Sequence, residues 1–110
     1  MNDTTDTEAQ PDVASLLGAL AHPQRLRIVA ELVAGGRQYV SELARRLQMS
    51  RPLLHMHLRR LEGAGAVVGS LELSPDGKAM RFYEVARFDV RLTPATVAAA
   101  VTRGTASTKS

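Results

Sequence analysis

The side chains of this sequence that are best suited to chemistry are arginines, and they gather in one stretch. Residues 37–60 contain six arginines and a single acid, Glu42. A guanidinium group presents a planar fork of hydrogen-bond donors, which fits a phosphate group or the edge of a guanine base. A local excess of positive charge therefore indicates a polyanion as the partner. The candidate contacts in this stretch are Arg45, Arg46, Arg51, Arg59 and Arg60.

Residues typical of catalytic and metal sites form no recognisable pattern. The sequence has no cysteine, which excludes disulfides and thiolate metal sites. It has no glycine-rich phosphate loop, and its carboxylates are scattered. Ser41, Glu42 and His55 could be arranged on paper as a catalytic set, but a helix cap and a solvated acid explain them more simply. We therefore expect no enzymatic activity and no cofactor.

The three histidines are expected to have separate roles. His55 and His57 would diverge by about 200° on a helix, so they cannot bind one metal ion together. His57 lies beside a leucine stripe and is expected to be packed or hydrogen-bonded within the fold. His55 is expected to be exposed, and His22 to cap a helix or to lie at an interface. No pair of these histidines suggests an arrangement for pH sensing.

The arginines lie mainly on two predicted helices that a short turn joins, within residues 40–68. Apolar residues at i, i+3, i+4 and i+7 give the first helix one apolar face: Val40, Leu43, Ala44 and Leu47. Ser50 is a favourable N-cap for the second helix, and Pro52 fits its first turn. Leu54, Leu58 and Leu61 form the apolar stripe of that second helix. This succession is the helix-turn-helix pattern.

The second helix, expected over residues 50–62 and ended by Gly63 and Gly65, has a face that the leucines leave free. At about 100° per residue, this outer face carries Pro52, His55, Met56, Arg59 and Arg60. An ordinary solvated helix with two arginines would look similar in isolation. The position of the helix directly after a helix and a turn favours a role in reading the major groove of DNA.

The remaining segments are expected to frame this motif. Apolar periodicity predicts helices over residues 13–20 and 23–35, and Pro94 begins a last helix of small apolar residues. Residues 67–73 and 80–85 have the character of strands, and residues 74–78 are a strong turn signal. They predict a hairpin in the place typical of the wing of a winged helix. Lys78 and Arg81 could contact backbone phosphate there, although a plain surface hairpin would also carry them.

Length and composition fit one small domain. The chain has 110 residues and a net charge of +3, and it lacks a run of about eighteen apolar residues. The expected fold over residues 12–103 is mainly α, with about five helices and a two-stranded wing. Residues 1–11, which are acidic, and residues 104–110 are expected to be disordered tails. Because the N-terminus is unlike a signal peptide, a cytoplasmic protein is expected.

Over residues 16–85 the sequence resembles the arsenic-repressor-like (ArsR/SmtB) winged-helix transcriptional regulators. The resemblance is carried by ALAHPQRLRIVAEL, by SELARRLQMSRPLLHMHLRRLEGAGAVV and by the hairpin ending RFYEV. Ser50, Pro52, His57 and Leu58 fit the family's recognition helix, whereas His22 stands where the family commonly has an acid. MarR-like and other winged-helix families share the core motif, so they stay open as alternatives.

The resemblance implies a homodimer, formed by the first and last helices, that places two recognition helices in successive major grooves of an inverted repeat. The implied interface residues are Val13, Leu16, Leu17, Leu20, Val97, Ala100 and Val101. Metal-sensing members carry a cysteine pair where this chain has Tyr39 and Ser41, and others bind zinc through acids and histidines that the last helix lacks here. Both metal sites are therefore expected to be absent. Gln48 replaces a common turn glycine, at a cost of about 1 kcal/mol.

Two functions from different classes stay open. The first is a dimeric, sequence-specific DNA-binding transcriptional repressor that does not sense metal. The second is a winged-helix module that contacts a protein or an RNA, which is weaker because the arginines cluster on the two helices that normally straddle a groove. The sequence identifies no effector. The predicted DNA contacts are Arg45, Arg46, Ser50, Arg51, Pro52, His55, Met56, Arg59, Arg60, Lys78 and Arg81.

Overall fold

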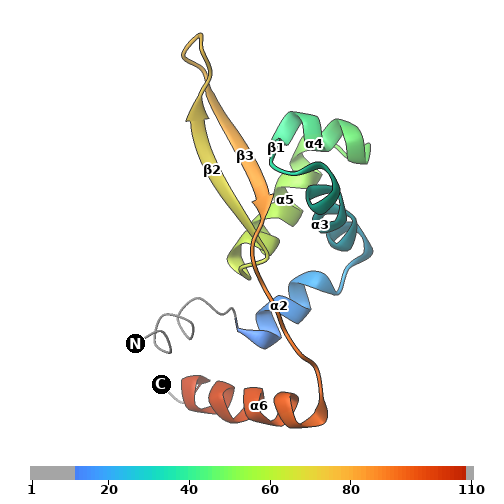
Figure 1. Cartoon of the computed structure of the whole chain (residues 1–110), viewed down its shortest axis with the longest axis vertical. Helices are drawn as coiled ribbons and strands as arrows, with labels where there is room; N and C mark the ends of the chain where they lie inside the picture. Colours follow the sequence, from blue (N-terminus) through green and yellow to red (C-terminus); the bar gives the residue numbers. More distant parts are fainter. Residues whose placement is uncertain (1–11, 109–110) are drawn as a thin grey trace.

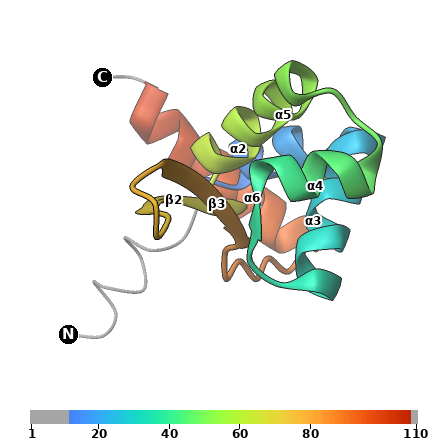
Figure 2. The same ribbon diagram turned by 90° about the horizontal axis from the view of Figure 1, so that it is seen from above.

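The computed structural model describes residues 12–108 as a helical body with a small sheet on one side (Figure 1). In chain order its elements are α2 (Val13–Leu20), α3 (Pro23–Gly35), β1 (Gln38–Tyr39), α4 (Val40–Leu47), α5 (Arg51–Gly63), β2 (Val67–Leu73), β3 (Ala79–Val85) and α6 (Pro94–Thr108). This arrangement confirms the predicted winged helix-turn-helix fold. Seen from above, the hairpin of β2 and β3 lies to one side of α3, α4 and α5 (Figure 2). Within residues 12–108, no helix has the length and apolar character needed to span a membrane.

Short polar signals decide where α2 and α3 begin and end. The Asp12 carboxylate accepts a hydrogen bond from the Ser15 amide at 3.0 Å and so caps α2. His22 caps α3, because its Nδ1 accepts from the Gln24 amide at 3.1 Å. This is one of the two roles expected of His22. Gly36 ends α3 with a φ of 75°, a left-handed conformation that glycine adopts without a steric penalty.

The turn between α4 and α5 has the geometry predicted for a helix-turn-helix. Gln48 adopts the left-handed conformation, with a φ of 56° and a ψ of 49°. This costs a residue with a side chain about 1 kcal/mol relative to glycine. The neighbouring Met49 is buried in the core and holds the turn in place. Ser50 then caps α5 by accepting from the Leu53 amide at 3.3 Å.

The core lies where α2, α3, α4 and α5 meet, and it is made largely of leucine. Each fully buried leucine or isoleucine side chain contributes about 1.5–3 kcal/mol to the free energy of folding. Since α5 supplies three of these residues, its orientation relative to the other helices is fixed from one side. The largest fully buried side chains are Leu16, Ile28, Leu32, Leu43, Leu54, Leu58 and Leu61.

The sheet is antiparallel and has three strands in the order β1-β3-β2. Its hairpin pairs residues 67–73 with residues 79–85, and the Ser74 amide donates to the Lys78 carbonyl at 2.7 Å to close the turn. The added strand is β1, in which Gln38 pairs with Tyr83 and Tyr39 with Phe82. A strand of two residues carries no periodic signal, so the sequence analysis expected only the two strands of the wing.

Three segments differ from the sequence analysis or lie beyond the described part. Helix α6 continues to Thr108, past the domain end expected at residue 103. The tail expected over residues 1–11, and residues 109–110 of the second tail, lie outside the described residues.

Candidate nucleic-acid interface

Helix α5 separates into a buried face and an exposed face along the line that its sequence predicts. Leu54, Leu58 and Leu61 pack into the core. The outer face is exposed and comprises Pro52, His55, Met56, Arg59 and Arg60. Met56 leaves 53% of its surface accessible. The core therefore supports α5 from behind and leaves a cationic face available to a partner.

Exposed cations continue from α5 onto the neighbouring elements. Arg51 is the first residue of α5, and Arg45 lies on α4 before the turn. Lys78 in the hairpin turn and Arg81 on β3 bring positive charge onto the wing. All of the predicted DNA contacts lie on the surface of this chain. Two helices and the wing thus each contribute exposed cations, which suits a polyanion as partner.

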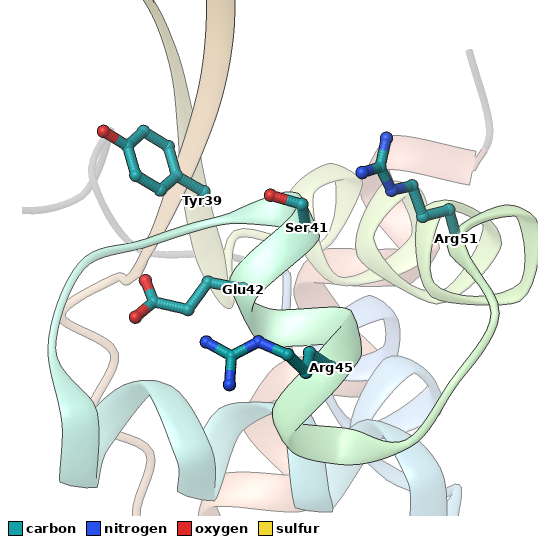
Figure 3. Close-up of a pocket in the computed structure, with 5 residues that line it drawn as sticks. All are labelled: Tyr39, Ser41, Glu42, Arg45 and Arg51. Carbon is teal, nitrogen blue, oxygen red and sulfur yellow. The ribbon is translucent and has the colours of Figure 1, made fainter.

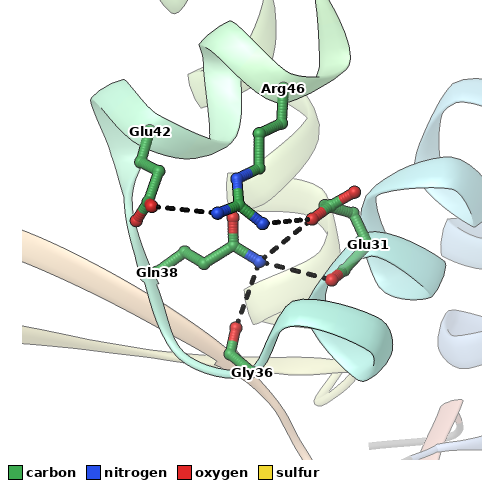
Figure 4. A network of polar contacts seen from close by, with 5 residues as sticks. All are labelled: Glu31, Gly36, Gln38, Glu42 and Arg46. Carbon is green, nitrogen blue, oxygen red and sulfur yellow. Dashed lines mark hydrogen bonds and ion pairs between the residues drawn. The ribbon is translucent and has the colours of Figure 1, made fainter.

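The adjacent arginines of α4 have different surroundings. The Arg46 guanidinium lies 3.4 Å from the Glu31 carboxylate and 3.3 Å from the Glu42 carboxylate (Figure 4). The Arg45 guanidinium makes no hydrogen bond or ion pair with the side chains described, those of residues 12–102. The Arg46 guanidinium therefore forms ion pairs with two acids of its own chain. The Arg45 guanidinium forms none, so it is available to a ligand.

Arg46 belongs to a polar network that joins α4 to α3 (Figure 4). The buried side-chain amide of Gln38 donates to the Glu31 carbonyl and carboxylate, each at 3.3 Å, and to the Gly36 carbonyl at 3.2 Å. Gly35 leaves room for this arrangement, because an added Cβ would lie 2.6 Å from Gln38 Nε2. The network positions α4, and sequence reasoning missed it because its members come from separate elements.

Arg45 and Arg51 line a pocket between the start of α4 and the start of α5 (Figure 3). The pocket has a volume of about 520 Å³, and its other lining residues are Tyr39, Ser41 and Glu42. The sequence analysis considered Tyr39 and Ser41 only as the positions of a missing cysteine pair. Nothing in the sequence indicates a pocket here, because it arises from the angle at which two helices meet.

The wing is attached to the rest of the domain by side chains at both of its strands. The Tyr83 hydroxyl donates to the Glu62 carboxylate on α5 at 3.3 Å. Burial, and then the Glu62 charge, raise the pKa of Tyr83, which keeps the phenol protonated as a donor. Arg37 pairs with Glu72 on β2, and its guanidinium lies 4.0 Å from the centroid of the Phe82 ring. Arg37, the first arginine of residues 37–60, therefore contacts both strands of the wing and stabilises the fold.

Behind α5 the structure brings His22 and His57 together, which the sequence analysis did not expect of any histidine pair. Their ring centroids are 4.8 Å apart, and Arg25 donates to His57 Nδ1 at 3.2 Å. His57 is 2% exposed, which confirms its prediction as a packed residue, and His55 is exposed as predicted. Burial, followed by the charges of His22 and Arg25, lowers the pKa of His57.

The two helices implied as a dimer interface expose only part of their apolar residues. Leu16 is buried in the core of its own chain, so it is not available to a partner subunit, contrary to the implied interface. Leu17 on α2 and both Val97 and Val101 on α6 are exposed. The other implied residues are partly buried: Val13, Leu20 and Ala100. In Figure 1, α6 lies at the lower end of the molecule and α4 lies in its upper half.

Comparison with known sequences connects this fold to transcription. The family described as a helix-turn-helix domain matches residues 20–69, which include all of α3, α4 and α5. A helix-turn-helix-type transcriptional regulator of Methanocaldococcus jannaschii is 36% identical over 77 residues, which cover 70% of this chain and 79% of that protein.

Solved structures show the same architecture. One is the homodimeric winged helix-turn-helix DNA-binding domain of a possible ArsR-family transcriptional regulator from Mycobacterium bovis. It is 28% identical, with a TM-score of 0.60, and the match covers 69% of this chain and 65% of that chain. Another is HlyU from Vibrio cholerae, which is 29% identical, with a TM-score of 0.57 and coverage of 69% and 76%.

Proposed function

Because the chain belongs to the helix-turn-helix transcriptional regulators and has the winged fold of the ArsR family, we propose that it is a dimeric repressor that binds an inverted repeat in DNA. In this proposal α5 enters the major groove, and Arg59 or Arg60 contacts a base edge. The wing, through Lys78 and Arg81, contacts the phosphate backbone.

The observation that carries the proposal is the two-sided character of α5. Leu54, Leu58 and Leu61 are buried and hold the helix in one orientation. On the opposite face Arg59 and Arg60 are exposed. The major groove of B-DNA admits one α-helix and presents a distinct pattern of donors and acceptors for each base pair. A rigid helix with an exposed arginine face is suited to that groove both in shape and in charge.

A dimer is supported by apolar surface that one chain leaves uncovered on α6. Val101 is 63% exposed, and Val97 lies one turn away on the same face. The winged domain from Mycobacterium bovis that this chain resembles is homodimeric. Two copies related by a two-fold axis would present two copies of α5, which is the arrangement that reads an inverted repeat.

The residues Tyr39 and Ser41, which stand where metal-sensing members of the family carry a cysteine pair, support regulation that does not depend on metal ions. The Tyr39 ring packs on Phe82, with centroids 4.2 Å apart, and Ser41 lines the pocket beside α5. Neither a phenol nor a hydroxyl is a favourable ligand for a soft metal ion. We therefore propose that metal ions do not control DNA binding in this protein.

Selection of duplexes from a random pool by the purified protein tests the proposal. We expect enrichment of an inverted repeat with half-sites about 10 base pairs apart, bound by two chains in sedimentation. Placed beside a promoter, this site should lower reporter expression when the protein is present. A pool that yields no enriched sequence, with no binding to any duplex at low salt, would contradict the proposal and favour a protein or RNA partner.

A further inference from the structure

The pocket between α4 and α5 contains two arginines that no acid neutralises. Its one acid, Glu42, lies 3.3 Å from Arg46, which is not part of the pocket lining. Arg46 therefore offsets the Glu42 charge from outside the pocket. Among residues 12–102, whose side chains the structure describes, the guanidinium groups of Arg45 and Arg51 have no ion-pair partner. The pocket thus carries a local excess of positive charge.

The start of α4 adds hydrogen-bond donors to this charge. Tyr39 is the N-cap residue of α4, and its side chain makes no capping hydrogen bond. Amides in the first turn of a helix lack partners within the helix, and the helix dipole makes that end favourable for an anion. The Ser41 hydroxyl lies in this turn and lines the pocket with Arg45 and Arg51 (Figure 3).

The position of the pocket connects it to the outer face of α5. Arg51 lines the pocket and begins α5, and the exposed Pro52 follows directly. In a helix-turn-helix complex the first helix of the motif crosses the DNA backbone while the second helix occupies the groove. A phosphate group at the edge of the groove that α5 occupies would therefore lie near the start of α4.

We propose that this pocket holds one phosphate group of the DNA backbone, with Arg45 and Arg51 donating to its oxygens and the Ser41 hydroxyl completing the contact. Guanidinium forks match the geometry of phosphate oxygens. The inference rests on the proposed DNA-binding function and adds a division of roles to it. The pocket raises the affinity for any duplex, whereas the outer face of α5 distinguishes sequences.

Two single variants test the assignment, Arg45→Ala in the pocket and Arg91→Ala in the segment between β3 and α6, because each removes one exposed arginine. Dissociation constants are measured at several salt concentrations, both for the selected duplex and for a scrambled duplex of equal length. We expect Arg45→Ala to weaken both complexes by the same factor, about tenfold. It should also lower the slope of log affinity against log salt by about 1 for each phosphate that the variant no longer neutralises.

Arg91→Ala is the matched control, since Arg91 is exposed but neither lines the pocket nor belongs to the predicted DNA contacts. Its salt slope should equal that of the parent protein, measured where circular dichroism shows both to be folded. Titration with inorganic phosphate gives a second readout that needs no DNA. The Ser41 amide resonance should shift and saturate in the parent protein, and Arg45→Ala should abolish that shift.

The outcomes separate the pocket from the function on which it rests. A parent protein that binds no duplex would contradict the proposed function as a whole. Duplex binding that Arg45→Ala leaves unchanged, in affinity and in salt slope, would overturn the phosphate contact alone. If inorganic phosphate then still shifts the Ser41 amide resonance, the pocket binds a free anion and not the DNA backbone. That outcome also overturns the inference.

Discussion

Gly69 on β2 lies opposite Tyr83 on β3, and a Cβ at Gly69 would come within 2.8 Å of Tyr83 Cε1. The missing side chain at Gly69 therefore leaves space for the tyrosine ring. From that position the Tyr83 hydroxyl reaches the Glu62 carboxylate on α5 at 3.3 Å. One glycine on the wing thus permits a bond between the wing and the helix that we propose reads DNA.

Gly69→Ala should destabilise the domain by about 1–3 kcal/mol, because the Tyr83 ring must leave its packed position. Thermal unfolding followed by circular dichroism measures the change. Gly18→Ala is the control, since nothing lies within 4 Å of a Cβ added there. Alanine is preferred to glycine inside a helix, so the control should melt at or above the temperature of the parent. A Gly69→Ala protein that melts like the parent would contradict the close approach of Gly69 and Tyr83.

The stability of the domain should fall as the pH drops below about 6.5. In the unfolded chain His57 has its ordinary pKa of 6.5, whereas in the folded state burial and the charges of His22 and Arg25 lower that pKa. Below pH 6.5 the unfolded state therefore binds more protons than the folded state, and unfolding becomes more favourable. Above pH 6.5 the ring is neutral in both states and the full stability is present.

Urea unfolding between pH 5 and pH 8 measures this pH dependence, and His57→Gln should reduce it. Protonation of Nδ1 also removes the acceptor for Arg25, which donates to that atom at 3.2 Å. His55→Gln is the matched control, because His55 lies exposed on the same helix. An equal pH dependence in His57→Gln and in the parent would show that His57 is not responsible.

The parts of the fold that could be predicted depend on residues close together in the chain. Ser50 caps the Leu53 amide three positions away, and the buried face of α5 follows from the spacing of its leucines. The exposure of Arg59 follows from the same spacing. Such relationships are local, so a single sequence contains them.

The parts that could not be predicted join residues that are distant in the chain. Strand β1 exists because Gln38 pairs with Tyr83, and no pattern around Gln38 indicates that partner. The different surroundings of Arg45 and Arg46 depend on Glu31 on another helix, so the sequence analysis treated the two arginines as equivalent. The pocket beside α5 has the same origin, since it exists only once α4 and α5 are packed.

Val101→Asp should weaken the proposed dimer. Val101 is exposed in the single chain, and a carboxylate placed in an apolar interface loses its hydration without gaining a partner. We expect the dissociation constant of the dimer to rise at least about tenfold, which corresponds to about 1.4 kcal/mol. Sedimentation equilibrium measures it. Thr102→Asp adds the same charge to another side of α6 and should leave association unchanged; equal effects of both variants would place the interface elsewhere.

Arg59→Ala should reduce the affinity for the selected duplex by about 1–3 kcal/mol and relax the preference at one base pair. The reason is that a bidentate pair of hydrogen bonds to a base edge forms only where the correct base is present, whereas a hydrogen bond to phosphate forms on every duplex. Competition between the selected duplex and its single-base variants measures the preference. The expected pattern is the opposite of that for Arg45→Ala, which should leave the preference intact.

Arg91→Ala is a control for net charge, because Arg91 is exposed in the segment between β3 and α6, away from α5 in the sequence. Arg91→Ala should change the affinity for DNA by only a small factor. It should leave the base-pair preference unchanged. If Arg59→Ala weakens the selected and the scrambled duplex equally, Arg59 contacts phosphate, and the base contact passes to Arg60 on the same exposed face. If Arg60→Ala then also weakens both equally, α5 binds DNA without reading it, and sequence specificity through this helix must be abandoned.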